Sequence, residues 1–145
     1  MARHTIRRAC ESDCAGMARL ATQLGYPASE DDLKLRLQHL LGSSNDLVFV
    51  AESDGAVVGW IHGFLSQPLE SDRRVEIGGL VVDEKFHRQG IGWELVRRVE
   101  QWAIGLGITE LVVRCRTTRQ EAHQFYQSLG CRPVKTQTVF RKCLN

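Results

Sequence analysis

Two glycines separated by one residue form a candidate anion-binding site. Gly90 and Gly92 lie in the sequence FHRQGIGWEL, residues 86–95, between a basic stretch and an apolar helical pattern. Because glycine has no Cβ, the chain can turn tightly there, and an anionic ligand can approach several backbone N–H groups. The dipole of the following helix adds roughly half a positive charge. These features favour a site for a phosphate or pyrophosphate, with His87 and Arg88 beside it.

Two glycines at this spacing also occur in turns that bind no anion. A plain turn between a strand and a helix uses glycine too, so a lone Gly-x-Gly leaves both possibilities open. A nucleotide P-loop would place Lys and then Ser or Thr after its last glycine, whereas Gly92 is followed by WEL. A dinucleotide fold would have a third glycine where Leu95 stands, in a turn after the first strand. Both nucleotide motifs therefore fit poorly.

The elements that position this turn predict one mixed α/β domain. Apolar and β-branched runs predict strands over residues 4–9, 47–52, 56–65, 75–82, 110–115 and 138–144. Helical spacing predicts helices over residues 11–24, 29–41, 90–104 and 119–129. Ser29 is a good N-cap, and Asp54-Gly55 is typical of a tight hairpin turn. We expect a single domain over residues 1–145, with a central sheet of about six to seven strands flanked by about four helices.

Two separate motifs resemble those of one known family. The run GGLVVDEKFHRQGIGWEL at residues 78–95, followed by RQEAHQFYQSLGCRP at residues 119–133, resembles the GNAT superfamily of acetyl-CoA-dependent N-acetyltransferases. The resemblance covers the whole domain in element order and implies acetyl-CoA as co-substrate, with no metal. In the family, the pattern Arg/Gln-x-x-Gly-x-Gly/Ala wraps the pyrophosphate of coenzyme A. Gly90 and Gly92 match this pattern, but His87 stands where Arg or Gln is usual. That departure puts the side-chain contribution in doubt and would make cofactor affinity pH-sensitive if the imidazole becomes charged.

The resemblance implies a set of cofactor-binding residues on one strand, the glycine turn and the start of the last helix. They are Leu80, Val81, Val82, His87, Arg88, Gln89, Gly90, Ile91, Gly92, Trp93 and Arg119. For Arg88 and Arg119, a solvated surface charge is the competing interpretation.

Attack of an amine on a thioester needs three kinds of assistance. A proton must leave the ammonium, the tetrahedral oxyanion must be stabilised, and the leaving thiolate must be protonated. The resemblance implies that strand residues 80–82 splay from their neighbour and offer free N–H groups to the acetyl carbonyl. Gly78-Gly79 makes a bulge or close approach plausible there, although both glycines could instead relieve crowding against a helix.

The resemblance also implies roles for two side chains. Tyr126 matches the family tyrosine whose hydroxyl protonates the leaving thiolate, and its alternative is a boundary tyrosine with a solvated hydroxyl. Glu76, the carboxylate inside the central strand, matches a glutamate that acts as base in several members, and partial burial would raise its pKa. Its alternative is a strand-end charge paired with Arg73, Arg74 or Arg114, with Asp83 as a weaker substitute base. His62 either lines the acceptor site or is a satisfied polar group of the core.

We therefore expect an N-acetyltransferase that transfers acetyl from acetyl-CoA to a primary amine of a small molecule by direct attack in a ternary complex. The acceptor side would be built from the first two helices and the loop at 66–74, which carry Glu30, Asp31, Asp32, Glu70 and Asp72. These carboxylates favour a polycationic amine. The alternatives are a protein or peptide N-acetyltransferase and a non-enzymatic coenzyme A binding module.

Composition narrows the range of partners and the compartment. The formal net charge of the 145 residues is +2, so a nucleic-acid partner is not expected. The five cysteines form no C-x-x-C pair, which suits a reduced chain and gives no metal motif. The sequence shows no secretory signal or membrane-length apolar run, and we expect a cytoplasmic protein. The final strand could mediate a homodimer.

Overall fold

The computed structural model describes residues 4–145. The chain divides into two compact units, residues 1–113 and residues 114–145, and each unit is described by itself. A single domain over residues 1–145 stays a prediction.

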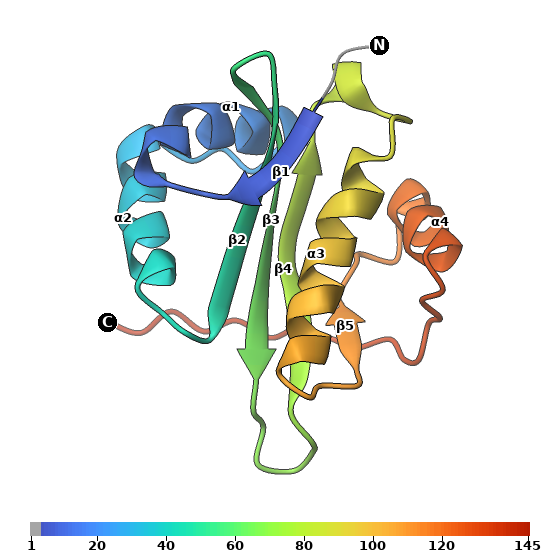
Figure 1. Ribbon diagram of the computed structural model, residues 1–145. Helices are drawn as coiled ribbons and strands as arrows, with labels where there is room; N and C mark the ends of the chain where they lie inside the picture. Colours follow the sequence, from blue (N-terminus) through green and yellow to red (C-terminus); the bar gives the residue numbers. More distant parts are fainter. Residues whose placement is uncertain (1–3) are drawn as a thin grey trace. The chain divides into compact units, whose positions relative to one another are not determined.

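The first unit is built on one mixed β-sheet with the strand order β1-β2-β3-β4-β5 (Figure 1). Neighbouring strands are antiparallel except β4 and β5, which are parallel. The strands are β1 (His4–Arg8), β2 (Asp46–Ser53), β3 (Ala56–Ser66), β4 (Arg74–Val82) and β5 (Leu111–Val113). The mixed α/β class is confirmed. The expected six to seven strands are wrong, because the described residues form five.

β2 and β3 form the tight hairpin that the sequence predicts. Asp54 and Gly55 at its tip have φ angles of 49° and 80°. Two left-handed residues give the turn a twist that matches the twist of the flanking strands. The register pairs Asp46 with Phe64 and Val48 with His62. Asp46 therefore lies two residues before the partner of His62, diagonally across from it on the same face of the sheet.

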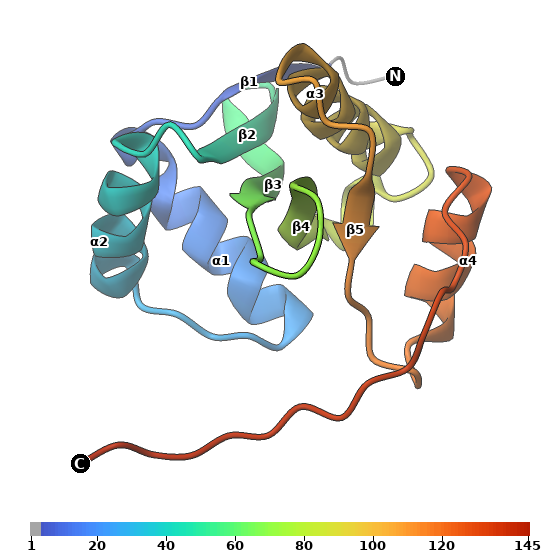
Figure 2. The same cartoon turned by 90° about the horizontal axis from the view of Figure 1, so that it is seen from below.

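Two helices cover one face of the sheet and a third covers the other (Figures 1 and 2). The first face carries α1 (Cys14–Leu24), which follows the 3-10 turn η1 (Glu11–Asp13), and α2 (Glu30–Leu41). The second face carries α3 (Ile91–Gly105).

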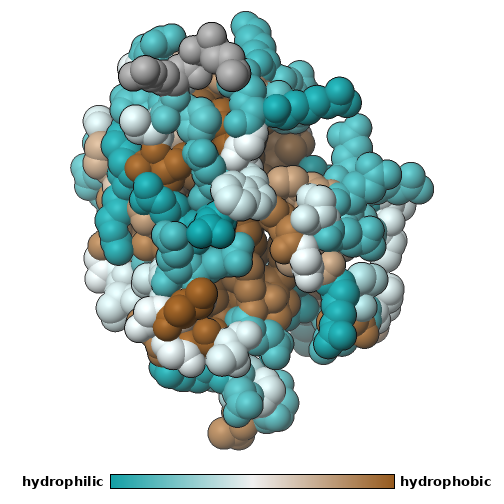
Figure 3. All heavy atoms as spheres, turned by 45° about the vertical axis from the view of Figure 1, so that its right-hand side comes forward, coloured by the Kyte–Doolittle hydropathy of each residue, from teal (hydrophilic) through white to brown (hydrophobic). Residues whose placement is uncertain are grey.

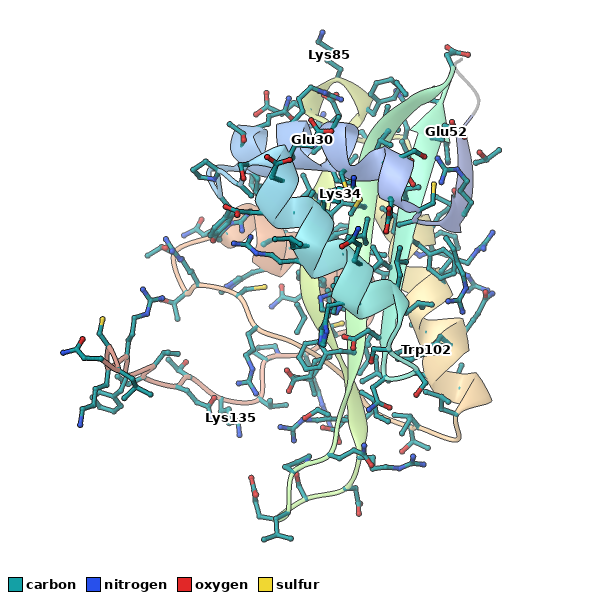
Figure 4. The ribbon with its side chains drawn as sticks, turned by 90° about the vertical axis from the view of Figure 1, so that its left-hand side faces the viewer. Glu30, Lys34, Glu52, Lys85, Trp102 and Lys135 are labelled. Atoms are coloured by element: carbon teal, nitrogen blue, oxygen red, sulfur yellow. The ribbon has the colours of Figure 1, made fainter. Side chains whose placement is uncertain are left out.

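Figure 4 shows the same layers from the side, with Glu30 and Lys34 marking α2 and Trp102 marking α3. Ser29 caps α2 as expected, since its hydroxyl accepts a hydrogen bond from the Asp32 N–H at 3.0 Å.

Apolar side chains fill both interfaces between helices and sheet. On the α1 and α2 side, the buried side chains of Leu20, Leu37 and Val50 belong to one cluster. On the α3 side, a Cβ added at Gly63 would lie 2.9 Å from Val99. Such a distance is too short for a real contact, so glycine at this position lets α3 approach β3 closely.

An ion pair ties β1 to the turn that opens α1. Two guanidinium nitrogens of Arg7 donate to the two carboxylate oxygens of Asp13 at 2.9 and 2.8 Å. The Cys10 N–H donates to the same carboxylate at 2.8 Å. Burial by itself would raise the pKa of Asp13, but these hydrogen bonds outweigh it and hold the pKa below its usual value.

The Asp13→Asn variant is expected to lose about 2–3 kcal/mol of unfolding free energy at pH 7, less than a fully buried pair because Arg7 is partly exposed. Because the pKa is lowered on folding, this stabilisation is present above the unfolded pKa, near 4, and is lost as the pH falls through the folded pKa. Urea unfolding should therefore show the difference from wild type shrinking below about pH 4. Glu11→Gln, the same change at an exposed residue of η1, should stay within about 0.5 kcal/mol. A constant difference across this pH range would contradict the assignment.

The second unit contains one helix, α4 (Gln120–Ser128). Residues 129–145 form neither helix nor strand, so the closing strand expected at 138–144 is wrong. The apolar content of that segment fits a strand, but a strand also needs a hydrogen-bonded neighbour, which composition alone does not predict. Val139, Phe140 and Leu144 are almost fully exposed. A homodimer through this segment stays a prediction.

The surface of the protein is mixed in polarity. Most of the face drawn in Figure 3 is hydrophilic, with apolar residues in patches between. Within residues 4–145, helices long and apolar enough to cross a membrane do not occur. The same residues contain no group of three or more side chains suited to hold a metal ion.

Candidate functional site

The glycine turn opens α3 with left-handed backbone. Gly90 is the N-cap of α3 with φ of 80°, and Arg88 two residues earlier has φ of 65°. The Glu94 N–H donates to the Gly90 carbonyl at 3.0 Å and makes the first bond of the helix. The N–H groups of residues 91–93 therefore precede the helical ladder and have no acceptor within it. Nothing lies within 4 Å of a Cβ added at Gly90, so an anion can reach these amides.

The side chains beside this turn are exposed, and one of them braces it. His87 donates from Nε2 to the Val82 carbonyl at 2.9 Å and so links the turn to the end of β4. Arg88 and Gln89 are exposed, and Lys85 extends away from the ribbon (Figure 4). The position where Arg or Gln was expected is thus occupied by a histidine with a structural contact.

Asp83 holds the segment between β4 and the turn against α1. Its carboxylate accepts hydrogen bonds from the Lys85 N–H at 3.1 Å and from Arg19 at 3.3 Å. The next residue, Glu84, donates its N–H to the Gln23 side chain at 3.1 Å. Burial would raise the pKa of Asp83, but the Lys85 N–H and Arg19 hold it below its usual value. These contacts favour a structural role over the substitute base considered from the sequence.

The edge of β4 that faces β5 is paired over only part of its length. Val75–Ile77 pair with Leu111–Val113, and the ladder stops there. The Asp83 N–H donates to the Val58 carbonyl on β3, so alternation turns the N–H groups of Leu80 and Val82 away from β3. Val81 has the opposite orientation. Two of the three expected amides therefore point toward the side of β4 where pairing with β5 has ended.

A β-bulge at two glycines distorts β4 beside this edge. Gly79 pairs with His62 and Ile77 pairs with Gly63, so Gly78 is the extra residue. A Cβ at Gly78 would lie 2.9 Å from His62 Nδ1, and a Cβ at Gly79 would lie 2.9 Å from the Trp60 ring. The expected bulge is confirmed. The crowding that the glycines relieve comes from two rings of β3 and not from a helix.

Glu76 is buried on β4 and paired. Its carboxylate accepts a hydrogen bond from Arg74 Nε at 3.3 Å, and the side chain is 10% exposed. The pairing with Arg74 that the sequence offered as an alternative is therefore present. The role of Glu76 as base stays a prediction.

A histidine–carboxylate pair lies on the same face as the bulge. His62 Nε2 is 2.8 Å from Asp46 Oδ1, and the His62 ring is 5.6 Å from the Phe64 ring. Sequence reasoning named His62 but missed Asp46, which lies 16 residues earlier. The Asp54-Gly55 turn alone does not predict this contact, because a β-bulge at Ala51 and Glu52 shifts the register by one residue before Asp46 pairs with Phe64.

The second unit carries the remaining candidates. Tyr126 on α4 is partly buried, and burial raises the pKa of its hydroxyl above the usual value. Its ring meets the Phe125 ring edge-on at 5.1 Å. Arg119 is the exposed N-cap of α4. His123 donates from Nε2 to the Arg116 carbonyl at 2.9 Å, which favours a structural role.

The acidic residues of the expected acceptor side are exposed. Glu30, Asp31 and Asp32 lie in the first turn of α2, where the helix dipole stabilises them. Lys34 follows Glu30 by one helical turn and offsets part of this charge (Figure 4). Glu70 and Asp72 lie exposed in the β3–β4 loop.

Comparisons with known proteins relate this chain to acetyltransferases. The model of the acetyltransferase (GNAT) family matches residues 12–131. N-acetyltransferase 8 of Homo sapiens is 34% identical over 91 residues, 62% of this chain and 40% of that protein. The aminoglycoside N(6')-acetyltransferase type 1 of Serratia marcescens is 25% identical over 130 residues, 86% of this chain and 89% of that protein.

A solved structure shares the fold over nearly the whole chain. An aminoglycoside N-acetyltransferase in complex with CoA superposes with a TM-score of 0.87 at 19% identity, covering 98% of this chain and 96% of that one. The match to the human relative is shorter, since the chain aligns with 40% of that protein's length.

Proposed function

The chain belongs to the acetyltransferase (GNAT) family, and on this basis we propose that it transfers the acetyl group of acetyl-CoA to a primary amine of a small molecule. The observation that carries the proposal is the open, left-handed turn at Gly90, which leaves the first amides of α3 without acceptors in the helix, together with the end of β4–β5 pairing at Ile77. GNAT enzymes use acetyl-CoA as co-substrate.

The residues present fit a diphosphate at this turn. The amides of residues 91–93 would bind it, and the space beside Gly90 admits it without a clash. Arg88, Gln89 and, from the second unit, Arg119 would add side-chain contacts, and His87 would hold the turn in place through Val82. Bound there, acetyl-CoA supplies a thioester carbonyl to the attacking amine.

The rest of the chain would supply the three kinds of assistance that the reaction needs. The N–H groups of Leu80 and Val82 would stabilise the oxyanion, because they point away from β3 at the edge where β5 ends. Tyr126 would protonate the leaving thiolate, and its raised pKa keeps its proton in place at neutral pH. Glu76 is the base that the sequence predicts, although Arg74 occupies one of its oxygens.

A polycationic amine is the acceptor class that we propose. The bacterial relative that matches most of the chain carries the name of an aminoglycoside N(6')-acetyltransferase. The exposed carboxylates at the start of α2 and in the β3–β4 loop would attract such a substrate.

A thiol-release assay with acetyl-CoA and a panel of aminoglycosides, polyamines, amino acids and peptides tests this proposal. We expect release with at least one small polyamine or aminoglycoside, and intersecting initial-velocity lines because attack occurs in a ternary complex. Release with peptides alone would indicate a peptide acetyltransferase. Tight coenzyme A binding without release across the panel would indicate a binding module.

A further inference from the structure

His62 has the arrangement of a histidine oriented to accept a proton. An ionised carboxylate only accepts hydrogen bonds, so the 2.8 Å contact between His62 and Asp46 places the ring proton on Nε2. Nδ1 then carries the lone pair. Among the described residues, the structure gives Nδ1 no hydrogen-bond partner of its own. The carboxylate fixes both the tautomer and the orientation of the ring.

The free nitrogen lies over the bulge of β4. A Cβ at Gly78 would be 2.9 Å from Nδ1, so only glycine at this position lets the ring nitrogen lie this close to β4. Gly78 is exposed to solvent, and it directly follows Ile77, the last residue of β4 that pairs with β5. Nδ1 therefore lies against a solvent-exposed glycine, next to the place where the pairing of β4 with β5 ends.

The charged groups on this face near His62 come from two neighbouring strands. Asp46 on β2 contacts the ring directly. On β4, Glu76 pairs with Phe64 in the sheet register and carries its hydrogen bond from Arg74. Both carboxylates favour the protonated ring once it has accepted a proton, and Arg74 opposes it.

We propose that His62, oriented by Asp46, is the general base that removes a proton from the acceptor ammonium. The inference rests on the proposed acetyl transfer and identifies the base of that same reaction. Nδ1 takes one ammonium proton, and the nitrogen lone pair forms the C–N bond to the acetyl carbon as the C–S bond breaks. The amine nitrogen then loses a second proton and the thiolate gains one. The His62 imidazolium returns its proton to solvent. The balance is one ammonium and one thioester giving one amide, one thiol and one proton.

Glu76 is less suited to this step than His62. One of its oxygens is occupied by Arg74 and its side chain is 10% exposed, whereas Nδ1 of His62 faces an exposed glycine. A neutral imidazole accepts a proton through the ring nitrogen that carries no hydrogen, which here is Nδ1.

The test compares kcat and its pH profile among His62→Gln, Asp46→Asn and wild type, with the best amine from the panel. His62→Gln should lower kcat by about 10²–10⁴-fold and abolish the acidic limb of the profile. Asp46→Asn should lower kcat less and move the acidic limb to lower pH, because losing the carboxylate makes the imidazolium easier to deprotonate. The Kd for coenzyme A, from calorimetry, should change less than about threefold in both variants, which is under 1 kcal/mol.

His4→Gln is the matched control, because His4 also bonds a carboxylate, Glu94, at 2.7 Å and lies on β1. It should keep the wild-type kcat. If wild type turns over and His62→Gln stays within threefold of it with an unchanged acidic limb, His62 is not the base and the proposed function stands. If wild type shows no turnover with any amine, the proposed function fails, and the role of His62 fails with it. If Asp46→Asn leaves the profile unmoved while His62→Gln abolishes activity and coenzyme A binding together, His62 is structural and the inference is overturned.

Discussion

The Tyr126→Phe variant is expected to lose about 10²–10³-fold in kcat while its KM for acetyl-CoA changes little. The change removes one hydroxyl, and the proposed task of that hydroxyl, protonation of the thiolate, arises only as the C–S bond breaks. An interaction made only in the transition state lowers kcat and kcat/KM equally when it is removed. General acid catalysis typically contributes this range of rate.

The pH profile gives an independent check on Tyr126. Burial raises the pKa of its hydroxyl above the usual value near 10, so the group that gives up the proton stays protonated at neutral and mildly alkaline pH. The wild-type kcat should therefore show no alkaline decline from this group below about pH 10. Thermal unfolding and coenzyme A affinity of Tyr126→Phe should match wild type. A variant that keeps kcat within threefold would show that another group protonates the thiolate.

Replacing Gly90 with alanine is expected to raise the Kd for coenzyme A by about 10–100-fold, equivalent to about 1.4–2.8 kcal/mol. The loss of affinity comes from the new methyl group, which enters the open space where the diphosphate is proposed to bind. The strain of a residue with a Cβ at φ of 80°, roughly 1–2 kcal/mol, lowers the unfolding free energy instead. Calorimetric titration with coenzyme A measures the result directly and does not depend on the acceptor.

Gly107→Ala is the control for backbone strain alone. Gly107 has φ of 77° and equally open surroundings, but it lies beyond the opposite end of α3. Both variants should lose similar unfolding free energy, and only Gly90→Ala should lose affinity. Equal affinities in the two variants would show that the diphosphate does not bind at this turn.

The sequence correctly predicted those features that depend only on a few adjacent residues. The Ser29 cap, the Asp54-Gly55 hairpin and the tight turn at Gly90 each depend on a few adjacent residues, and all three are present. The segment at 138–144 differs, because forming a strand depends on a partner elsewhere in the chain. The apolar side chains of Val139 and Phe140 favour a strand, but they carry no information on whether it finds a partner.

The features of the candidate site also differ in whether they depend on adjacent residues or on pairing between distant ones. The bulge at Gly78-Gly79 was readable from two glycines inside a strand, and the residue types of β4 already offered Arg74 as a partner for Glu76. The contact between Asp46 and His62 was not found, because it requires the register of the hairpin as well as the residue types.

The bulge of β4 restricts which residues can stand at the matching positions of β3 and β4. His62 occupies the space that a side chain at position 78 would need, and Trp60 occupies the space that one at position 79 would need. A larger residue at Gly78 or Gly79 therefore requires a smaller residue at the matching position of β3. Redesigning this part of the sheet for a bulkier acceptor would therefore mean two substitutions made together, a smaller residue for a ring on β3 and a larger residue for the matching glycine on β4.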